Sequence, residues 1–157
     1  MDNLVIVRTV KLVSRSPEES AQFDVTQLNQ TITLGQMIKG VVGKESVGLF
    51  TSPHADARKM THILHNEFLV DSKSIAALYS GLSTRPNLTE ISALIKTNEV
   101  RFSTLVLVTH RDICTVLPVL YARLFRISHL TQEVPPGHAC VISMQKRKIT
   151  LLDPRTG

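Results

Sequence analysis

Apolar and polar positions along this chain follow two different spacings. Three short apolar runs have the length of β-strands: residues 4–7, 47–51 and 104–108. The third run consists almost entirely of β-branched residues and leucine, a pattern typical of a strand that is buried on both faces of a sheet. Each run is followed by a segment with helical spacing, so the pattern predicts strands that each lead into a helix.

The helical segments after the second and third runs are the clearest. Residues 55–68 carry apolar side chains at helical spacing, and residues 112–125 form an apolar helix in which Pro118 is expected to introduce a kink. Residues 71–82 are a weaker helical stretch, and a further helix is predicted over residues 90–96, next to Thr89 as its cap.

The helical pattern after the first run is less regular. Ser16 is expected to cap a short helix that reaches Phe23, because proline and then glutamate follow it. A loop is predicted from there through Asn29. Thr33 is then expected to cap a helix of about ten residues that ends at Gly43.

The last part of the chain predicts a hairpin. Pro135-Pro136-Gly137 introduces two strands, residues 139–144 and 149–152, which a basic turn joins. Strands that alternate with helices predict an α/β fold, with right-handed crossovers between parallel strands. We therefore expect a three-layer α/β/α arrangement around a mostly parallel sheet, with an antiparallel C-terminal hairpin. Without an internal repeat or a linker, residues 1–157 are expected to form one domain.

Composition excludes several classes of protein. A chain of 157 residues with 43% hydrophobic and 20% charged residues can bury a sizeable core and is neither disordered nor collagen-like. No apolar run is long enough to cross a bilayer, and the amino terminus does not have the pattern of a secretory signal. Two cysteines make no disulfide framework. We therefore expect a cytoplasmic protein that does not bind membranes.

The net charge of +5 raises the question of nucleic-acid binding. The basic residues are scattered, however, and the densest group, Lys146-Arg147-Lys148, falls in the predicted hairpin turn. Aromatic residues make up only 4% of the chain, which is few for a surface that stacks bases. A nucleic-acid-binding module stays open as an alternative, and a phosphate-binding pocket explains the charge as well.

Polar side chains gather where the three predicted strands end. Arg8-Thr9 follows the first strand, Ser52-Pro53-His54 the second, and Thr109-His110-Arg111 the third. Ligands of open α/β sheets bind beyond the carboxyl ends of the strands. Arginine, histidine and the free amides of a helix N-terminus at one edge would suit an anion such as phosphate.

The same segments carry a resemblance to a known family. LVIVRTV, LFTSPHADARKMTHIL, LVLVTHRDI and GHACVISM, in this order, resemble the histidine phosphatase (phosphoglycerate mutase-like) superfamily. Size and spacing are most similar to its small bacterial phosphohistidine phosphatases. The resemblance extends over residues 4–152 and implies the phosphoglycerate mutase-like fold for the expected α/β/α layers.

The motifs depart from the family where its chemistry takes place. The family's first strand ends in Arg-His-Gly, in which the histidine accepts the phosphoryl group and the arginine binds phosphate. Arg8 matches that arginine, whereas Thr9 stands in place of the nucleophile and Val10 in place of the glycine. In the second motif Ser52 matches the family serine, but Asp56 occupies the position of a phosphate-binding arginine.

The third motif keeps its histidine, His110, while Arg111 replaces the family glycine. The resemblance thus implies His110 as a retained catalytic residue and Thr9 as a substitute for the nucleophile. Phosphate-binding residues are then Arg8, Ser52, Arg58 and Arg111, with Asp56 disrupting the site. A threonine hydroxyl is scarcely ionised near neutral pH, whereas imidazole is a competent nucleophile there.

We expect a pseudophosphatase that binds a phosphorylated protein or a small phosphoester without hydrolysing it. The alternative is an active phosphatase with a rearranged site that uses His110 with Arg8 and His54. No cofactor and no metal are expected, and the sequence leaves the oligomeric state open.

Several other candidates have simpler interpretations. His62 and His65 lie three residues apart on a predicted helix, but no third or fourth metal ligand accompanies them, so we favour a solvated helix face. Cys114 falls inside a helix, where it is expected to pack in the core rather than act as a nucleophile. Acidic residues after the first strand are candidate proton donors, although a helix-capping role is the simpler reading: Glu18, Glu19 and Asp24.

Overall fold

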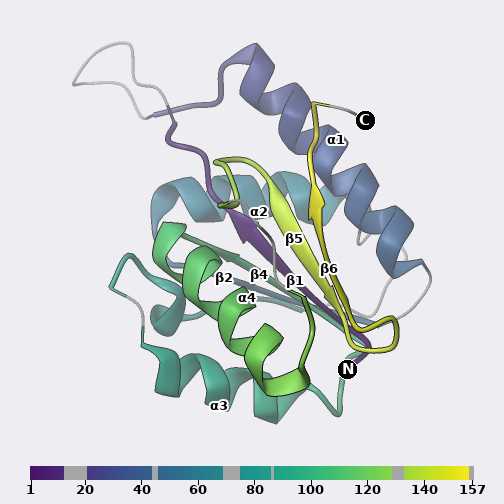
Figure 1. Ribbon diagram of the computed structural model, residues 1–157. Helices are drawn as coiled ribbons and strands as arrows, with labels where there is room; N and C mark the ends of the chain where they lie inside the picture. Colours follow the sequence, from purple (N-terminus) through teal and green to yellow (C-terminus); the bar gives the residue numbers. More distant parts are fainter. Residues whose placement is uncertain (13–20, 44–45, 69–74, 86, 129–132, 156–157) are drawn as a thin grey trace.

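A six-stranded sheet forms the centre of the protein (Figure 1). The structure is a computed structural model, and it describes residues 1–12, 21–43, 46–68, 75–85, 87–128 and 133–155. Along the sheet the strands follow the order β3-β2-β4-β1-β5-β6. Their bounds are β1 Asn3–Arg8, β2 Val47–Thr51, β3 Ile75–Leu78, β4 Thr104–Thr109, β5 Ala139–Ser143 and β6 Lys148–Leu152.

Helices cover both faces of this sheet (Figure 1). They are α1 Val25–Val42, α2 Ala55–Phe68, α3 Leu88–Asn98 and α4 Arg111–Phe125, with a short 3₁₀ helix, η1, at Ser80–Leu82. The first two pack on one face, and α3 and α4 on the other. The expected α/β/α layers are therefore confirmed. In the described part of the chain, no helix combines the length and apolarity that crossing a bilayer would require.

The register of the sheet brings the ends of three strands to one edge. β1 and β2 both pair with β4 in parallel, with Arg8 opposite Thr109 and Thr51 opposite Val108. β3 adds to β2 in parallel as well. By contrast, β5 is antiparallel to β1 and β6 to β5. The sheet is thus mixed, and the antiparallel C-terminal hairpin is confirmed.

Successive side chains of the central strands point to opposite faces of the sheet, and this divides the core into two halves. In β4, Leu105 and Leu107 belong to the cluster beneath α3 and α4, whereas Val106 and Val108 belong to the cluster beneath α1 and α2. All four side chains are fully buried. This explains why the segment is continuously apolar, since a strand between two helical layers has no solvent-facing side.

Helix α1 begins earlier than the sequence pattern predicts. Asp24 is its cap: the carboxylate accepts a hydrogen bond from the Gln27 amide at 2.7 Å, and the Gln27 side chain accepts one from the Asp24 amide at 3.2 Å. The predicted loop through Asn29 and the cap at Thr33 are therefore wrong. The first turns of α1 carry mostly exposed residues and lack apolar spacing, so the apolar pattern does not reveal where the helix begins. Gly43 does end the helix, with φ of 65°.

Three other local predictions need correction. Residues 75–82 contain β3 and η1 instead of the predicted α-helix. The strand forms because β2 offers a hydrogen-bonding partner, which local spacing cannot reveal. Residues 71–74 of the same prediction lie outside the described part. Most of the predicted helix from Ser16 also lies outside it, and the described residues 21–23 are not helical. Helix α3 is capped by Asn87 rather than Thr89, through a bond from the Glu90 amide at 3.1 Å.

Candidate functional site

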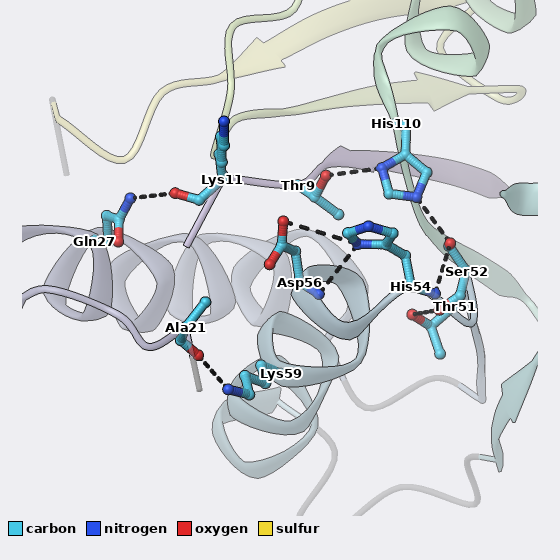
Figure 2. Close-up of polar contacts among 10 residues, drawn as sticks. All are labelled: Thr9, Lys11, Ala21, Gln27, Thr51, Ser52, His54, Asp56, Lys59 and His110. Carbon is cyan, nitrogen blue, oxygen red and sulfur yellow. Dashed lines mark hydrogen bonds and ion pairs between the residues drawn. The ribbon is translucent and has the colours of Figure 1, made fainter. Parts of the chain in front are cut away.

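The carboxyl ends of β1, β2 and β4 bring three polar side chains into one hydrogen-bonded chain (Figure 2). Thr9 Oγ1 lies 3.2 Å from His110 Nδ1, and His110 Nε2 lies 2.8 Å from Ser52 Oγ. His110 is also the residue that precedes α4 as its N-cap. Residues distant in sequence thus meet at the edge where parallel strands end, as the sequence predicts. We call this group, together with His54 and Asp56, the strand-tip site.

The surroundings of His110 disfavour the protonated form of its imidazole. Partial burial, chiefly, and then the neighbouring His54 lower the pKa of His110, while the negative charge of Asp56 acts in the opposite direction. Both ring nitrogens face hydroxyl groups, which either donate or accept, so a neutral ring is satisfied in either tautomer. Ser52 is fully buried, and its hydroxyl also accepts a hydrogen bond from the His54 amide at 3.2 Å. The buried Ser52 hydroxyl thus orients the imidazole ring of His110.

Asp56 and His54 form the second side of the strand-tip site, at the start of α2 (Figure 2). The Asp56 carboxylate lies 3.8 Å from His54 Nδ1, and its side chain is only 19% exposed. The ring of His54 meets that of His110 edge-on, with 5.4 Å between the centroids. The aspartate at the position of the family arginine thus lies inside the strand-tip site and adds negative charge to it.

Substitutions at His54 and Asp56 should move the pKa of His110 in opposite directions. His54→Gln removes a neighbour that disfavours the imidazolium and should raise this pKa, whereas Asp56→Asn removes a favourable charge and should lower it. NMR titration of the histidine ring signals measures both, with His65→Gln as a control on α2. Shifts of the same sign in the two variants would contradict the arrangement described.

The two arginines beside the strand ends are engaged with other groups. Arg8 donates from Nη1 to the Val134 carbonyl oxygen at 2.8 Å. Arg111 is 67% exposed and pairs with Glu133, with 2.7 Å between Nε and the carboxylate oxygen. This pair raises the pKa of Arg111 and lowers that of Glu133. Although Arg111 follows His110 directly in sequence, its guanidinium is therefore directed to the loop before β5 and not to His110.

Arg58 lies on the exposed surface of α2, where it lines a cavity together with Lys59 and His62. Of the residues predicted from the sequence, the structure brings Thr9, Ser52, Asp56 and His110 into contact with one another or with His54. It places Arg58 at a cavity beside α2 and pairs Arg111 with Glu133. Their phosphate-binding roles stay predictions.

Sequence reasoning missed the groups that hold these arginines. Glu133 and Val134 come from the loop between α4 and β5, and no motif marks them. It also missed the pair of His138 with Asp153. His138 is buried, with 4% of its side chain exposed; its Nδ1 donates to the Pro136 carbonyl oxygen at 2.9 Å, and its Nε2 lies 3.1 Å from the half-buried Asp153 carboxylate. The backbone of His138 accepts from the Arg8 amide, so this pair supports the end of β1.

The remaining candidates do not assemble into a site. Within the described ranges, no group of three histidine, cysteine or acidic side chains is arranged to hold a metal ion. Asp24 is committed to capping α1, and Glu18 and Glu19 lie outside the described residues. Cys114 and Cys140 are both buried, and burial raises the pKa of each thiol, that of Cys140 to about 12.

The native protein should therefore show no reactive thiol. Both cysteines lack the thiolate form near neutral pH and are shielded from solvent, so we expect slow reaction with Ellman's reagent in buffer and two equivalents of reaction in guanidinium chloride. Rapid modification of one equivalent in the native state would support a cysteine nucleophile instead.

Comparisons with solved structures identify the fold. The histidine phosphatase SixA in complex with tungstate has a TM-score of 0.69 and 14% identity, and the match covers 98% of each chain. A protein from Agrobacterium tumefaciens assigned as phosphohistidine phosphatase SixA has a TM-score of 0.68 and 13% identity, with 97% of this chain and 96% of that one covered. This chain has the histidine phosphatase fold.

Phosphoglycerate mutase from Plasmodium falciparum is a more distant neighbour, with a TM-score of 0.54, 14% identity and coverage of 96% of this chain and 88% of that one. The histidine phosphatase fold therefore extends over nearly the whole chain, as the order of the four sequence motifs predicts. No protein-family model matches the sequence, and no curated protein matches it. The likeness thus lies in the structure and in short motifs.

Proposed function

We propose that this chain is a binding domain with the histidine phosphatase fold that does not hydrolyse phosphohistidine or phosphoesters. One observation carries the proposal: the residue that follows β1 and faces His110 is a threonine. The hydroxyl oxygen of Thr9 lies 3.2 Å from His110 Nδ1. The resemblance assigns a histidine nucleophile to this position. A threonine hydroxyl needs a strong base to attack phosphorus, and the ester it would form is hydrolysed far more slowly than a phosphoimidazole.

The charges of the strand-tip site support the same conclusion. A phosphate dianion would meet the Asp56 carboxylate, where the resemblance places an arginine. At about 4 Å and an effective dielectric constant near 20, the repulsion between two unit negative charges amounts to about 4 kcal/mol, and a dianion would experience about twice as much. Asp56 is mostly buried, so solvent screens its charge only in part. Phosphate alone should therefore bind weakly.

The proposed ligand is a phosphorylated protein or a small phosphoester, recognised in the cytoplasm. Arg8 and His110 are the retained residues that support this class, and a neighbour of the same fold binds tungstate, an oxyanion similar to phosphate. Because Asp56 opposes the anion, most of the affinity should come from groups of the ligand other than its phosphate.

Two measurements test the proposal. The natural chain is expected to release no phosphate from para-nitrophenyl phosphate above the buffer rate. Asp56→Asn should bind tungstate at least about tenfold more tightly than the natural chain, as measured by calorimetry, because one opposing charge is removed. Asp2→Asn, at the opposite end of β1, is the matched control and should leave the affinity unchanged. Turnover by the natural chain, or equal affinities for tungstate, would contradict the proposal.

The second candidate is an active phosphatase in which His54 replaces Thr9 as the nucleophile. The edge-on contact between His54 and His110, 5.4 Å between centroids, favours it, as does the 51% exposure of the His54 side chain. This candidate requires turnover of para-nitrophenyl phosphate that His54→Gln abolishes. The same assay therefore separates the two functions.

A further inference from the structure

A cavity of about 660 Å³ lies between α2, the start of α1 and the segment that precedes α1. Phe23, Leu28 and Ile63 supply apolar side chains to it, and Ala55, at the start of α2, also lines it. Its size falls in the range of sites that hold small organic molecules. Leu28 is 37% exposed, so the cavity presents apolar surface to solvent.

The rim of the cavity is basic. Arg58, Lys59 and His62 line it, and no acidic residue does so among the residues that the structure describes. Lys59 donates to the Ala21 carbonyl oxygen, which fastens the segment before α1 against α2 (Figure 2). The backbone amide of Arg58 donates to the His54 carbonyl oxygen at 3.0 Å, whereas its guanidinium forms no hydrogen bond or ion pair with any described residue, and Arg58 is exposed. The nearest acid along α2, Asp56, lies against His54 instead.

We propose that this cavity binds an apolar organic acid, that is, a carboxylate on an aromatic or aliphatic body. The hydrocarbon body would cover Phe23, Leu28 and Ile63, and removal of this surface from water favours binding. Arg58 would hold the carboxylate, since a guanidinium offers two parallel donors to its two oxygens. Apolar surface beside an unpaired cation favours an amphipathic anion over a neutral apolar molecule and over a bare inorganic ion.

This site is separate from the strand-tip site and does not depend on the proposed function. The strand-tip site consists of histidines, hydroxyls and a carboxylate, and none of its five residues lines the cavity. The cavity has an apolar wall and no acid among its described lining residues. Substitutions at Thr9 or Asp56 should therefore change oxyanion binding and leave the binding of an apolar acid unaltered.

The test uses 2-naphthoate and its neutral isostere 2-naphthamide, with binding followed by naphthyl fluorescence and by amide shifts in NMR spectra. We expect saturable binding of naphthoate with shifts at residues 23, 28, 58 and 63, and at least about tenfold weaker binding of the amide. Arg58→Gln should weaken naphthoate about tenfold and leave the amide unchanged. Leu28→Ala should weaken both compounds. The matched control is Arg123→Gln, an exposed arginine in the last turn of α4.

Each result decides the proposal. Equal affinities for acid and amide, or an undiminished affinity in Arg58→Gln, would overturn the role of Arg58. Absence of saturable binding to the natural chain, or shifts confined to the strand-tip site, would overturn the assignment of the cavity. Circular dichroism checks that the variants fold, which is expected because Arg58 and Leu28 lie on exposed helical surface.

Discussion

The double variant Thr9→His/Asp56→Arg is expected to hydrolyse para-nitrophenyl phosphate, whereas the natural chain is expected not to hydrolyse it. The first change places an imidazole at the end of β1, beside His110, where it can accept a phosphoryl group. The second replaces a repelling carboxylate by a guanidinium that pairs with phosphate oxygens. Removal of one such electrostatic contact costs enzymes roughly 10²–10³ in rate, so we expect a gain of at least about 100-fold over the natural chain.

Single variants and a control make this experiment decisive. Thr9→His alone and Asp56→Arg alone should each remain well below the double variant, because attack and phosphate binding are both required. Thr89→His, on the exposed first turn of α3, adds a histidine away from the strand-tip site and should have no activity. A folded double variant that binds tungstate but stays inactive would contradict the expectation that these two changes are sufficient, and would implicate the other departures from the motifs, Val10 and Arg111.

A second large effect is expected in the core. Leu107→Ala should lower the free energy of unfolding by about 2–5 kcal/mol, because it leaves a cavity in the central strand. Val106→Ala, on the opposite face of β4, should cost roughly 1.5–3 kcal/mol. Urea unfolding followed by circular dichroism should show one transition in each variant, because β4 carries both halves of the core. This result would support one domain over residues 1–157.

Val100→Ala is the control, because Val100 is 85% exposed and its truncation should change stability by no more than about 0.5 kcal/mol. If Leu107→Ala instead produced two separate transitions, the layers on the two faces of the sheet would be folding independently. The single-domain prediction would then be wrong.

The local pattern of apolar residues was sufficient to predict an element wherever the burial of that element is reflected in the spacing of its apolar side chains. The run at residues 104–108 identified β4, and the spacing over residues 55–68 identified α2, because side chains that face a core must be apolar at regular intervals. The pattern failed where strand pairing or helix capping decides which element forms or where it begins. β3 forms because β2 lies beside it, and α1 begins at the capping box of Asp24 and Gln27, ahead of any apolar stripe.

For the site, the sequence by itself determined which residues end the parallel strands, because chain order and strand polarity bring those ends to one edge. That was sufficient to bring Thr9, Ser52 and His110 together and to place Asp56 beside them. Only the tertiary structure decided where long side chains extend. Arg111 pairs with Glu133, and Arg58 lines a cavity beside α2. An arginine side chain is long and flexible, so its position depends on which carboxylate or surface the folded chain places within its reach.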